Sequence, residues 1–296
     1  MEGELFAALY RAVQDEAKRC SRPKRVQFSD AFIVLVFFWA VLHDRPTCWA
    51  CDRRHWPNNL ARDSLPSPAT MTRRLRTYSC NALIERLYHR VRVLGPVALG
   101  LCRVIDTKPL VVNGFSKDRD AKRGYATGGL ARGYKLAAAW GNGLVPDAVM
   151  IFPLNVSDQS SGIHLIDHLR QDDPAATGYL LADATHDTNT LHEYAAAHAF
   201  QLLTPRKKPG TDLGHRDHSP ARLRSIELLE GPGRFGKSLY QQRGIIERDL
   251  AHLCGFGGGL QPLPSWVRHP QRVARWVLAK LILNALRECR NKGLAA

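Results

Sequence analysis

Three carboxylates lie along the chain in settings that one α/β sheet would bring together. Asp106 lies in VIDTKPLVV, Asp183 in YLLADATHD and Glu247 in YQQRGIIERDL. Crowded carboxylates raise one another's pKa unless a cation neutralises their charge. Oxygen ligands without thiolates select Mg²⁺ or Mn²⁺, and two such ions can promote an in-line phosphoryl displacement. The three acids therefore predict a site with two Mg²⁺ (or Mn²⁺) ions that cuts or joins nucleic acid.

Each acid alone has a simpler interpretation. Asp106 could end a strand, and Asp183 could cap the helix that follows it. Glu247 could form an ordinary helical ion pair with Arg243. Only their joint arrangement, with each acid on the expected element in the expected order, indicates a site.

The elements expected to position these acids follow an order typical of an α/β domain. Strands are predicted over residues 101–112, 133–140, 145–153, 179–182 and 200–204, with a hairpin turn at Asn142-Gly143. Helices are predicted over 158–169, 188–199 and 235–252. This order predicts an RNase H-like fold, a mixed five-stranded sheet with flanking helices. The segments 113–132 and 205–233 are expected to be basic loops, and the second could hold a short helix.

The charge of the chain favours a polyanionic partner. Its 42 Lys and Arg against 27 Asp and Glu give a net charge of +15, and nucleic acid is the commonest partner of such a protein. Basic residues close to the acids are candidates for DNA contact: Lys108, Arg132, Lys135, Arg206, Lys207 and Lys208. Phosphate contacts would make binding fall steeply with salt. The alternatives are a protein that is merely basic and a charge run that faces solvent.

Residues 1–95 are expected to form a helical DNA-binding region, and Gly95-Pro96 marks the boundary with a catalytic domain over 96–296 that includes a C-terminal helix. A helix is predicted to begin at Ser67-Pro68 and run to about residue 94. Its early turns carry Arg73, Arg74 and Arg76. This helix start resembles the recognition helix of a helix-turn-helix, although a solvent-facing basic surface is the competing interpretation.

Several other classes of protein are disfavoured. Seven scattered cysteines do not form the pattern of a disulfide framework and favour a reducing, cytoplasmic setting. Cys48 and Cys51 form a CxxC near His55, but the further ligands of a zinc site do not follow nearby, and packed cysteines are the simpler interpretation. The apolar run of 12 residues over 31–42 is too short to span a bilayer, so no membrane partner is expected.

Four stretches together resemble a known family: VIDTKPLVV, the segment from RGYKLAAAWGNG to NVSDQ, YLLADATHDTNTL with LLTPRKKPG, and SLYQQRGIIERDLAHL. Over roughly residues 25–290 the chain is similar to bacterial insertion-sequence transposases of DDE type, especially the compact ones without a large insertion domain. The resemblance implies that the three acids are metal ligands. Tyr240, Arg243 and Glu247 match its Tyr-x-x-Arg-x-x-x-Glu pattern, in which Tyr and Arg contact the DNA backbone. Their spacing allows all three to share one helix face.

The resemblance implies a DNA transposase that binds terminal inverted repeats, cleaves the element's ends and joins them to target DNA. A homodimer on double-stranded DNA is expected, in the bacterial cytoplasm at the nucleoid. One alternative is an RNase H-like nuclease without strand transfer. The other is a catalytically impaired DNA-binding derivative, suggested by Ala184-Thr185-His186 after Asp183, where the family usually reads Lys-Gly-Tyr after Asp.

Overall fold

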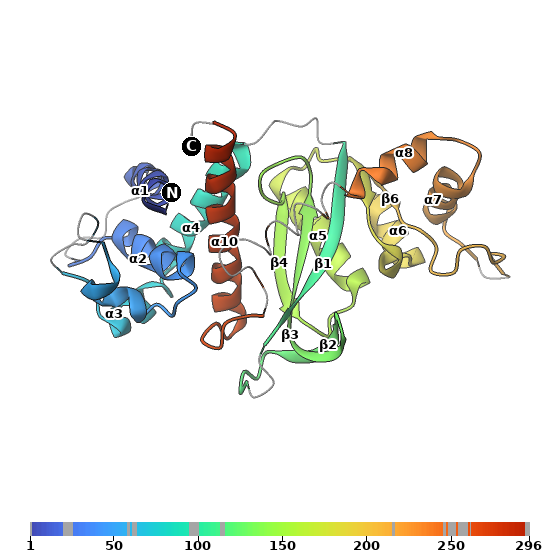
Figure 1. Cartoon of the computed structure of the whole chain (residues 1–296). Coiled ribbons are helices and arrows are strands. Elements are labelled where there is room, and N and C mark those ends of the chain that lie inside the picture. Colours follow the sequence, from blue (N-terminus) through green and yellow to red (C-terminus); the bar gives the residue numbers. More distant parts are fainter. Residues whose placement is uncertain are drawn as a thin grey trace. The chain divides into compact units, whose positions relative to one another are not determined.

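The computed structural model describes residues 2–19, 26–57, 60, 64–94, 101–112, 116–214, 217–244, 247, 253, 260 and 262–293. The chain divides into two compact units (Figure 1). One unit comprises Met1–Gly95 with Leu253–Ala296, and the other comprises Pro96–His252. They are called the helical unit and the sheet unit below.

The sheet unit is built on one mixed sheet. Its strands are β1 (Cys102–Val111), β2 (Lys122–Ala126), β3 (Gly129–Trp140), β4 (Ala148–Pro153), β5 (Gly178–Leu181) and β6 (Phe200–Leu203). The order is β2-β3-β1-β5-β6, and β4 also pairs with β3. β1, β2 and β4 run antiparallel to β3, whereas β1, β5 and β6 are mutually parallel. β2 pairs with residues 129–133 of β3 and β4 with 134–139, so both share one edge, and the sheet is five strands wide as expected.

The hairpin of β2 and the start of β3 replaces the loop expected over 113–132. Its two-residue turn, Thr127-Gly128, lies between the paired residues Ala126 and Gly129. Gly128 and Gly129 have φ values of +97° and +121°, a conformation that glycine adopts without strain. In β2 only Gly124 is buried, so the strand lacks the alternation of apolar residues by which strands are recognised.

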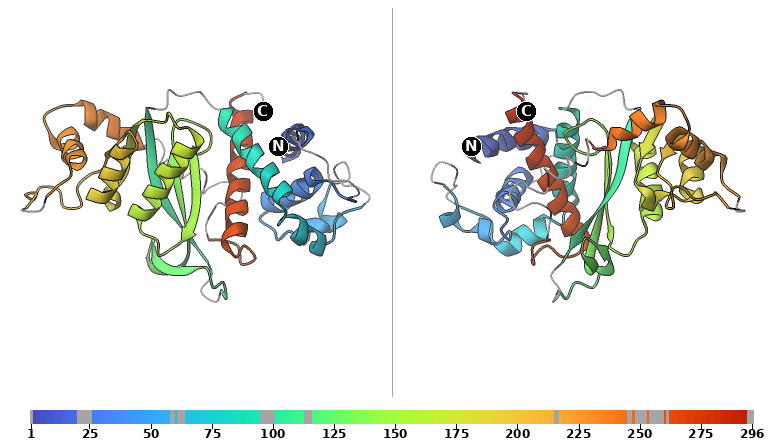
Figure 2. Two further views of the ribbon diagram at one scale, coloured as in Figure 1. Left: turned by 180° about the vertical axis from the view of Figure 1, so that it is seen from behind. Right: turned by 45° about the vertical axis from the view of Figure 1, so that its right-hand side comes forward.

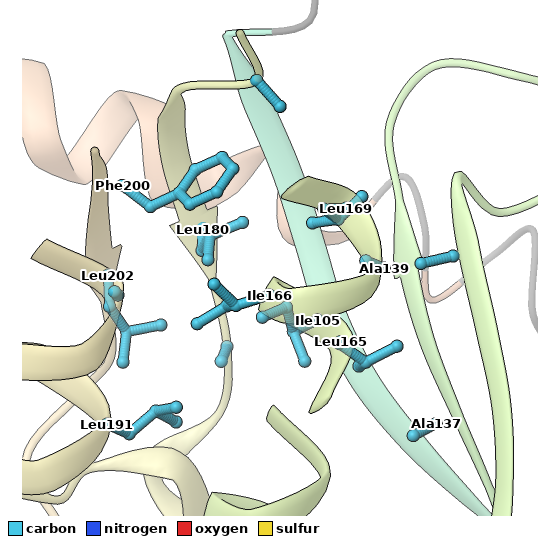
Figure 3. Close-up of a cluster of buried hydrophobic side chains, with 14 residues drawn as sticks. Ile105, Ala137, Ala139, Leu165, Ile166, Leu169, Leu180, Leu191, Phe200 and Leu202 are labelled. Atoms are coloured by element: carbon cyan, nitrogen blue, oxygen red, sulfur yellow. The ribbon is translucent and has the colours of Figure 1, made fainter. Parts of the chain in front are cut away.

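The core of the sheet unit lies under two helices, α5 (Asp158–Asp172) and α6 (Asn189–Ala197). Figure 2 shows α5 across one face of the sheet. In Figure 3, Ile105 of β1 and Leu180 of β5 pack against Leu165 and Ile166 of α5. All four side chains are fully buried. Because burial of each such side chain is worth about 1.5–3 kcal/mol, this core fixes the two strands that lead to Asp106 and Asp183.

Two further helices follow β6. α7 (Pro220–Glu230) begins at the N-cap Ser219 with Pro220 in its first turn, and it supplies the short helix within the segment 205–233. α8 (Phe235–Gln241) covers the first part of the helix expected over 235–252, but it ends at the C-cap Gln242, so that expected helix is interrupted there. Glu247 is helical as well, whereas residues 245–246 and 248–252 lie outside the described part of the chain.

The helical unit contains α1 (Glu2–Lys18), α2 (Asp30–Leu42), α3 (Pro68–Arg74), α4 (Tyr78–Val93) and α10 (Pro270–Asn291). The apolar run over 31–42 forms α2, whose residues 31–41 are all buried. None of the described helices is long and apolar enough to cross a membrane. Short 3₁₀ turns at Trp49–Cys51 and Arg53–His55 contain the CxxC segment, where the Cys51 thiol donates to the Thr47 carbonyl at 3.3 Å.

The segment expected as one helix from residue 67 to 94 is instead divided into α3 and α4. Between them lie Leu75, Arg76 and Thr77. Thr77 is the N-cap of α4, accepting from the Cys80 backbone N–H at 3.5 Å, while its hydroxyl donates to the Arg74 carbonyl at 2.7 Å. A capping threonine satisfies backbone groups that a continuous helix would otherwise pair, which explains the break.

The C-terminal helix α10 packs against α1, α2 and α4, so it groups with the helical unit rather than with the catalytic domain to which the sequence assigned it. Two buried cations attach it. Lys280 forms an ion pair with Asp44, and Arg275 donates to the Leu75 carbonyl and, at 3.2 Å, to Asn81 Oδ1. An amphipathic helix can pack on either unit, and its internal Arg and Lys residues resemble solvent-facing ones in the sequence, so the pattern could not assign it.

Candidate active site

Asp106 lies on the central strand of the sheet. In β1 it pairs with Ala138 of β3, and its Oδ1 accepts the Thr107 backbone N–H at 2.8 Å. Burial raises the pKa of Asp106, and the neighbouring charge of Asp183 acts in the same direction. The Thr107 hydrogen bond and the positive charge of Arg243 lower that pKa but do not offset the burial.

Asp183 lies beside Asp106 because of the register of two parallel strands. Val104 of β1 pairs with Leu181 of β5, and each acid lies two residues further along its own segment. Asp183 follows the carboxyl end of β5, where ligands bind in α/β folds, and Asp106, in the middle of β1, lies level with it.

The surroundings of Asp183 act on its pKa in the opposite direction. Its Oδ1 receives the Thr185 backbone N–H at 3.0 Å, the Thr185 hydroxyl, and Nδ1 of His186 at 2.8 Å. Burial alone would raise the pKa of Asp183, but the hydrogen bonds from His186 and Thr185 hold it well below its ordinary value. Asp183 is therefore ionised in neutral solution.

The segment from α8 to Glu247 carries the third acid and the Tyr and Arg of the predicted pattern. The Tyr240 hydroxyl donates to the carbonyl of Ala182, the residue before Asp183, at 3.1 Å. Arg243 donates to the Tyr240 oxygen at 3.3 Å and forms an ion pair with Glu247 at 3.2 Å. Burial would lower the pKa of Arg243, but Tyr240 and the charges of Asp106 and Glu247 raise it. The helix segment is thus hydrogen-bonded to the end of β5, next to both aspartates.

The charge of Arg243 links the acids in pairs: it interacts with Asp106 and with Glu247, and Asp106 interacts with Asp183. Among the residues that the structure describes, their carboxylate oxygens do not all lie within 4.8 Å of one another. Glu247 is directed to Arg243 and is more than half exposed. The donor set nevertheless fits a hard divalent cation, because it offers only carboxylate oxygens. Within the described chain, Oδ2 of Asp106 and Oδ2 of Asp183 have no hydrogen-bond donor, which leaves one oxygen of each for a cation.

The predicted DNA-contacting residues of the sheet unit fall into two groups. Three have internal partners. Lys135 pairs with Asp158 at 2.6 Å, Arg132 donates to the carbonyls of Ala121, Ser116 and Asp118, and Arg206 forms a bidentate pair with Glu230 at 2.6 Å. The other three are available: Lys108 is half-buried on β1, and Lys207 and Lys208 are exposed.

Lys207 and Lys208 line a cavity of about 590 Å³ beyond the end of β6. Arg206 and Arg222 also line it, together with the acidic residues Asp187, Asp212 and Asp217. Within it, Arg222 forms a bidentate pair with Asp187 at 2.6 and 2.8 Å. The exposed Lys207 and Lys208 therefore lie beside two arginines, Arg206 and Arg222, whose guanidinium groups are paired with carboxylates.

In the helical unit, α3 and the turn after it carry the predicted arginines. Arg73 and Arg76 are exposed. Arg74 is instead an internal residue that pairs with Asp30 at 2.6 Å and donates to the Phe28 carbonyl at 2.8 Å.

Two residues near the acids were not predicted as site residues from the sequence. Asp158, at the start of α5, accepts both Lys135 and the Thr107 hydroxyl at 3.0 Å, so it supports the residue next to Asp106. Burial would raise the pKa of Asp158, but Lys135 holds it below its ordinary value. His186 is fully buried and contacts Asp183. An Asp in the first turn of a helix and a His after a strand are both common, so neither pattern indicates a site.

The fold and the site define a metal-dependent phosphoryl-transfer enzyme with an RNase H-like sheet. The family model described as the transposase DDE domain matches residues 99–284. The chain therefore belongs to the DDE transposase domain family. No curated protein and no solved structure matches the chain.

Proposed function

We propose that this chain is the transposase of a compact bacterial insertion sequence. It binds the terminal inverted repeats, cleaves DNA at the element's ends and joins the freed 3′-hydroxyl groups to target DNA. The observation that carries the proposal is that Asp106 on β1 and Asp183 just after β5 lie level on neighbouring parallel segments. Tyr240, seven residues before Glu247 in the chain, donates to the Ala182 carbonyl beside Asp183. Family membership supports the same chemistry.

In this proposal Asp106, Asp183 and Glu247 hold two Mg²⁺ (or Mn²⁺) ions. When bound, such ions activate water or a 3′-hydroxyl as the nucleophile and stabilise the leaving oxygen. Arg243 pairs with Glu247, its charge acts on Asp106, and it supplies a permanent positive charge for a DNA phosphate. Tyr240 keeps the helix aligned with the end of β5 through the Ala182 carbonyl.

The helical unit would bind the element's ends through α4 rather than α3. In a helix-turn-helix, the second helix enters the major groove with its N-terminal residues. Here α4 follows α3 after three residues, and its first residue, Tyr78, is 87% exposed. A groove of about 680 Å³ beside it is lined by the cations Lys18, Arg19 and Arg86. Exposed Arg73 and Arg76 would add phosphate contacts.

The remaining DNA contacts would come from Lys108, Lys207 and Lys208, whose side chains are accessible in the sheet unit. A homodimer would pair the two ends of the element, and the protein would act at the bacterial nucleoid in the cytoplasm.

The test is cleavage and joining in vitro with the DNA ends that flank the gene. With Mg²⁺, the wild-type protein should nick these ends, and pre-cleaved ends incubated with a target plasmid should yield joined products. Cleavage without joining would support a nuclease instead. Full activity in Asp106→Asn or Glu247→Gln variants would refute the assigned metal ligands.

A further inference from the structure

The turn after β5 departs from the family pattern, and its residues surround one oxygen of Asp183. Ala184–His186 form a single 3₁₀ turn for which Asp183 is the N-cap. Three donors converge on Oδ1 of Asp183: the Thr185 backbone N–H, the Thr185 hydroxyl and the His186 ring. The replaced residues therefore make direct contacts with a predicted metal ligand.

The chemistry of the pair fixes which ring nitrogen carries the hydrogen. The ionised Asp183 carboxylate can only accept, so Nδ1 of His186, 2.8 Å away, must donate. The other ring nitrogen, Nε2, is buried and has no hydrogen-bond partner within the described residues. Among the described residues, the polar contacts of this fully buried ring are both at Nδ1, to Asp183 and to the adjoining Thr185 hydroxyl.

Packing holds the ring in place. Gly162 of α5 faces His186 and Leu191, and a methyl group at Gly162 would come within 3.7 Å of the ring and 3.1 Å of Leu191. Leu191 is itself fully buried. The imidazole therefore fills a space bounded by α5, and it presents Nδ1 from a fixed position.

We propose that His186 is a positioning residue of the metal site, which holds Oδ1 of Asp183 through Nδ1 and so directs Oδ2 to the cation shared with Asp106. This inference rests on the proposed metal-dependent function. A hydrogen-bond partner behind a ligand typically changes metal affinity by 10–100-fold when it is removed. The altered turn is then a different support for the same carboxylate, and it does not indicate loss of chemistry.

Replacing His186 by Asn or by Gln tests whether the hydrogen-bond donor must stand at the position of Nδ1 or whether any polar side chain suffices. In His186→Asn the side-chain amide nitrogen stands where Nδ1 stood, whereas in His186→Gln it stands one bond further out. His186→Phe removes the donor and keeps a ring. Mn²⁺ binding to the full chain without DNA is measured by calorimetry, and thermal unfolding in EDTA is measured alongside.

We expect Asn to retain Mn²⁺ affinity within about threefold, and Gln and Phe to weaken it by about 10–100-fold. His192→Phe is the matched control, because His192 is also buried, also has one unpartnered ring nitrogen, and contacts Asp187 and Thr204 instead. It should lower the unfolding temperature similarly while leaving Mn²⁺ affinity unchanged.

Thr185→Val provides a second variant that does not depend on a buried ring. Thr185 is exposed, so its loss should leave the unfolding temperature unchanged and weaken Mn²⁺ binding by a few-fold through the lost hydroxyl contact. Wild-type affinity in His186→Phe, or equal losses in the Asn and Gln variants, would overturn the role of Nδ1. A folded wild-type protein that binds no Mn²⁺ would overturn the proposed function itself.

Discussion

Asp106 and Asp183 each lie two residues beyond the paired strand residues Val104 and Leu181. Their surroundings nevertheless shift their pKa values in opposite directions. Asp106 is half-buried, and burial raises its pKa, because within the described residues its carboxylate accepts only the Thr107 backbone N–H. Asp183 has three donors on one oxygen, which lower its pKa. Without a cation, the protein therefore supports the ionised form of Asp106 less than that of Asp183.

Replacing Asp106 by Asn should remove cation-dependent stabilisation without unfolding the protein. A group with a raised pKa in the folded state destabilises that state once pH exceeds its unfolded pKa, so the neutral Asn should match or exceed wild-type stability in EDTA at pH 7. At Mn²⁺ of 100 times the dissociation constant, wild type should gain about 2.7 kcal/mol, and Asp106→Asn should gain almost none. Thermal unfolding with EDTA and with Mn²⁺ measures both effects.

Repeating the thermal unfolding in EDTA at lower pH gives an internal control. As pH falls from 7 towards 4, the advantage of Asp106→Asn over wild type in EDTA should shrink, because Asp106 becomes protonated and neutral. A wild-type protein that gains as little from Mn²⁺ as the Asn variant would contradict the assignment of Asp106 as a ligand.

The strands that lead to the two aspartates could be predicted, because apolar residues that end at an acid, Val104-Ile105 before Asp106 and Leu180–Ala182 before Asp183, are typical of buried strand segments. The hairpin of β2 could not be predicted, since Lys122, Arg123 and Tyr125 face solvent and bury almost nothing. The placement of α10 could not be predicted either. It depends on Arg275 reaching a carbonyl 200 residues away in the chain, which no local pattern encodes.

The candidate site shows the same limit. Tyr240, Arg243 and Glu247 could be predicted from their match to the Tyr-x-x-Arg-x-x-x-Glu pattern of the family that the chain resembles. The partners of the basic residues could not, because the sequence does not tell whether a cation faces solvent or an internal acid. Lys135 and Arg132 were predicted to contact DNA, but Lys135 donates to the Asp158 carboxylate and Arg132 donates to the Ala121 carbonyl.

Asp187 should make the sheet unit sensitive to acid. Burial would raise its pKa, but hydrogen bonds from Arg222 and His192 hold it well below the ordinary value. A depressed pKa contributes stability above the unfolded value of about 3.9, and this stability is lost as pH falls through the folded value. Asp187→Asn should therefore cost on the order of 3 kcal/mol at pH 7, because Arg222 loses its buried partner, and the cost should shrink below pH 4.

Urea unfolding between pH 3 and pH 7 measures this difference. Asp173→Asn is a suitable control, because Asp173 is an exposed acid at the end of α5 and should change stability little at any pH. A pH-independent difference between Asp187→Asn and wild type would show that the carboxylate charge does not contribute.

Arg275 should couple the C-terminal helix to DNA binding by the helical unit. Its side chain is only 8% exposed, and it donates to the Leu75 carbonyl at the turn between α3 and α4. Arg275→Ala should leave that carbonyl without this donor, at a cost of about 1–3 kcal/mol, and should weaken binding of the element's end. Electrophoretic mobility shifts measure the binding, and Mn²⁺ calorimetry should show an unchanged metal site.

Gln271→Ala is the control on the same helix, since Gln271 is exposed. It should leave both DNA binding and stability at wild-type values. Weakened Mn²⁺ affinity in Arg275→Ala would contradict the assignment of α10 to the helical unit.

Tyr78 and the exposed arginines of α3 should contribute to DNA binding in distinguishable ways. Tyr78 is neutral and 87% exposed at the start of α4, so Tyr78→Ala should weaken binding to the element's end relative to unrelated DNA by roughly 1–3 kcal/mol, with the salt dependence unchanged. Arg73→Gln and Arg76→Gln should weaken binding to both DNAs alike and should each reduce the slope of log K against log salt by about one. Fluorescence anisotropy from 50 to 200 mM salt separates the two effects.

Arg74→Gln differs again, because Arg74 pairs with Asp30 inside the unit and its loss should appear first as a lower unfolding temperature. If Tyr78→Ala weakened binding to the element's end and to unrelated DNA equally, another element would recognise the DNA sequence. If Arg73→Gln left the slope of log K against log salt unchanged, Arg73 would not contact a phosphate.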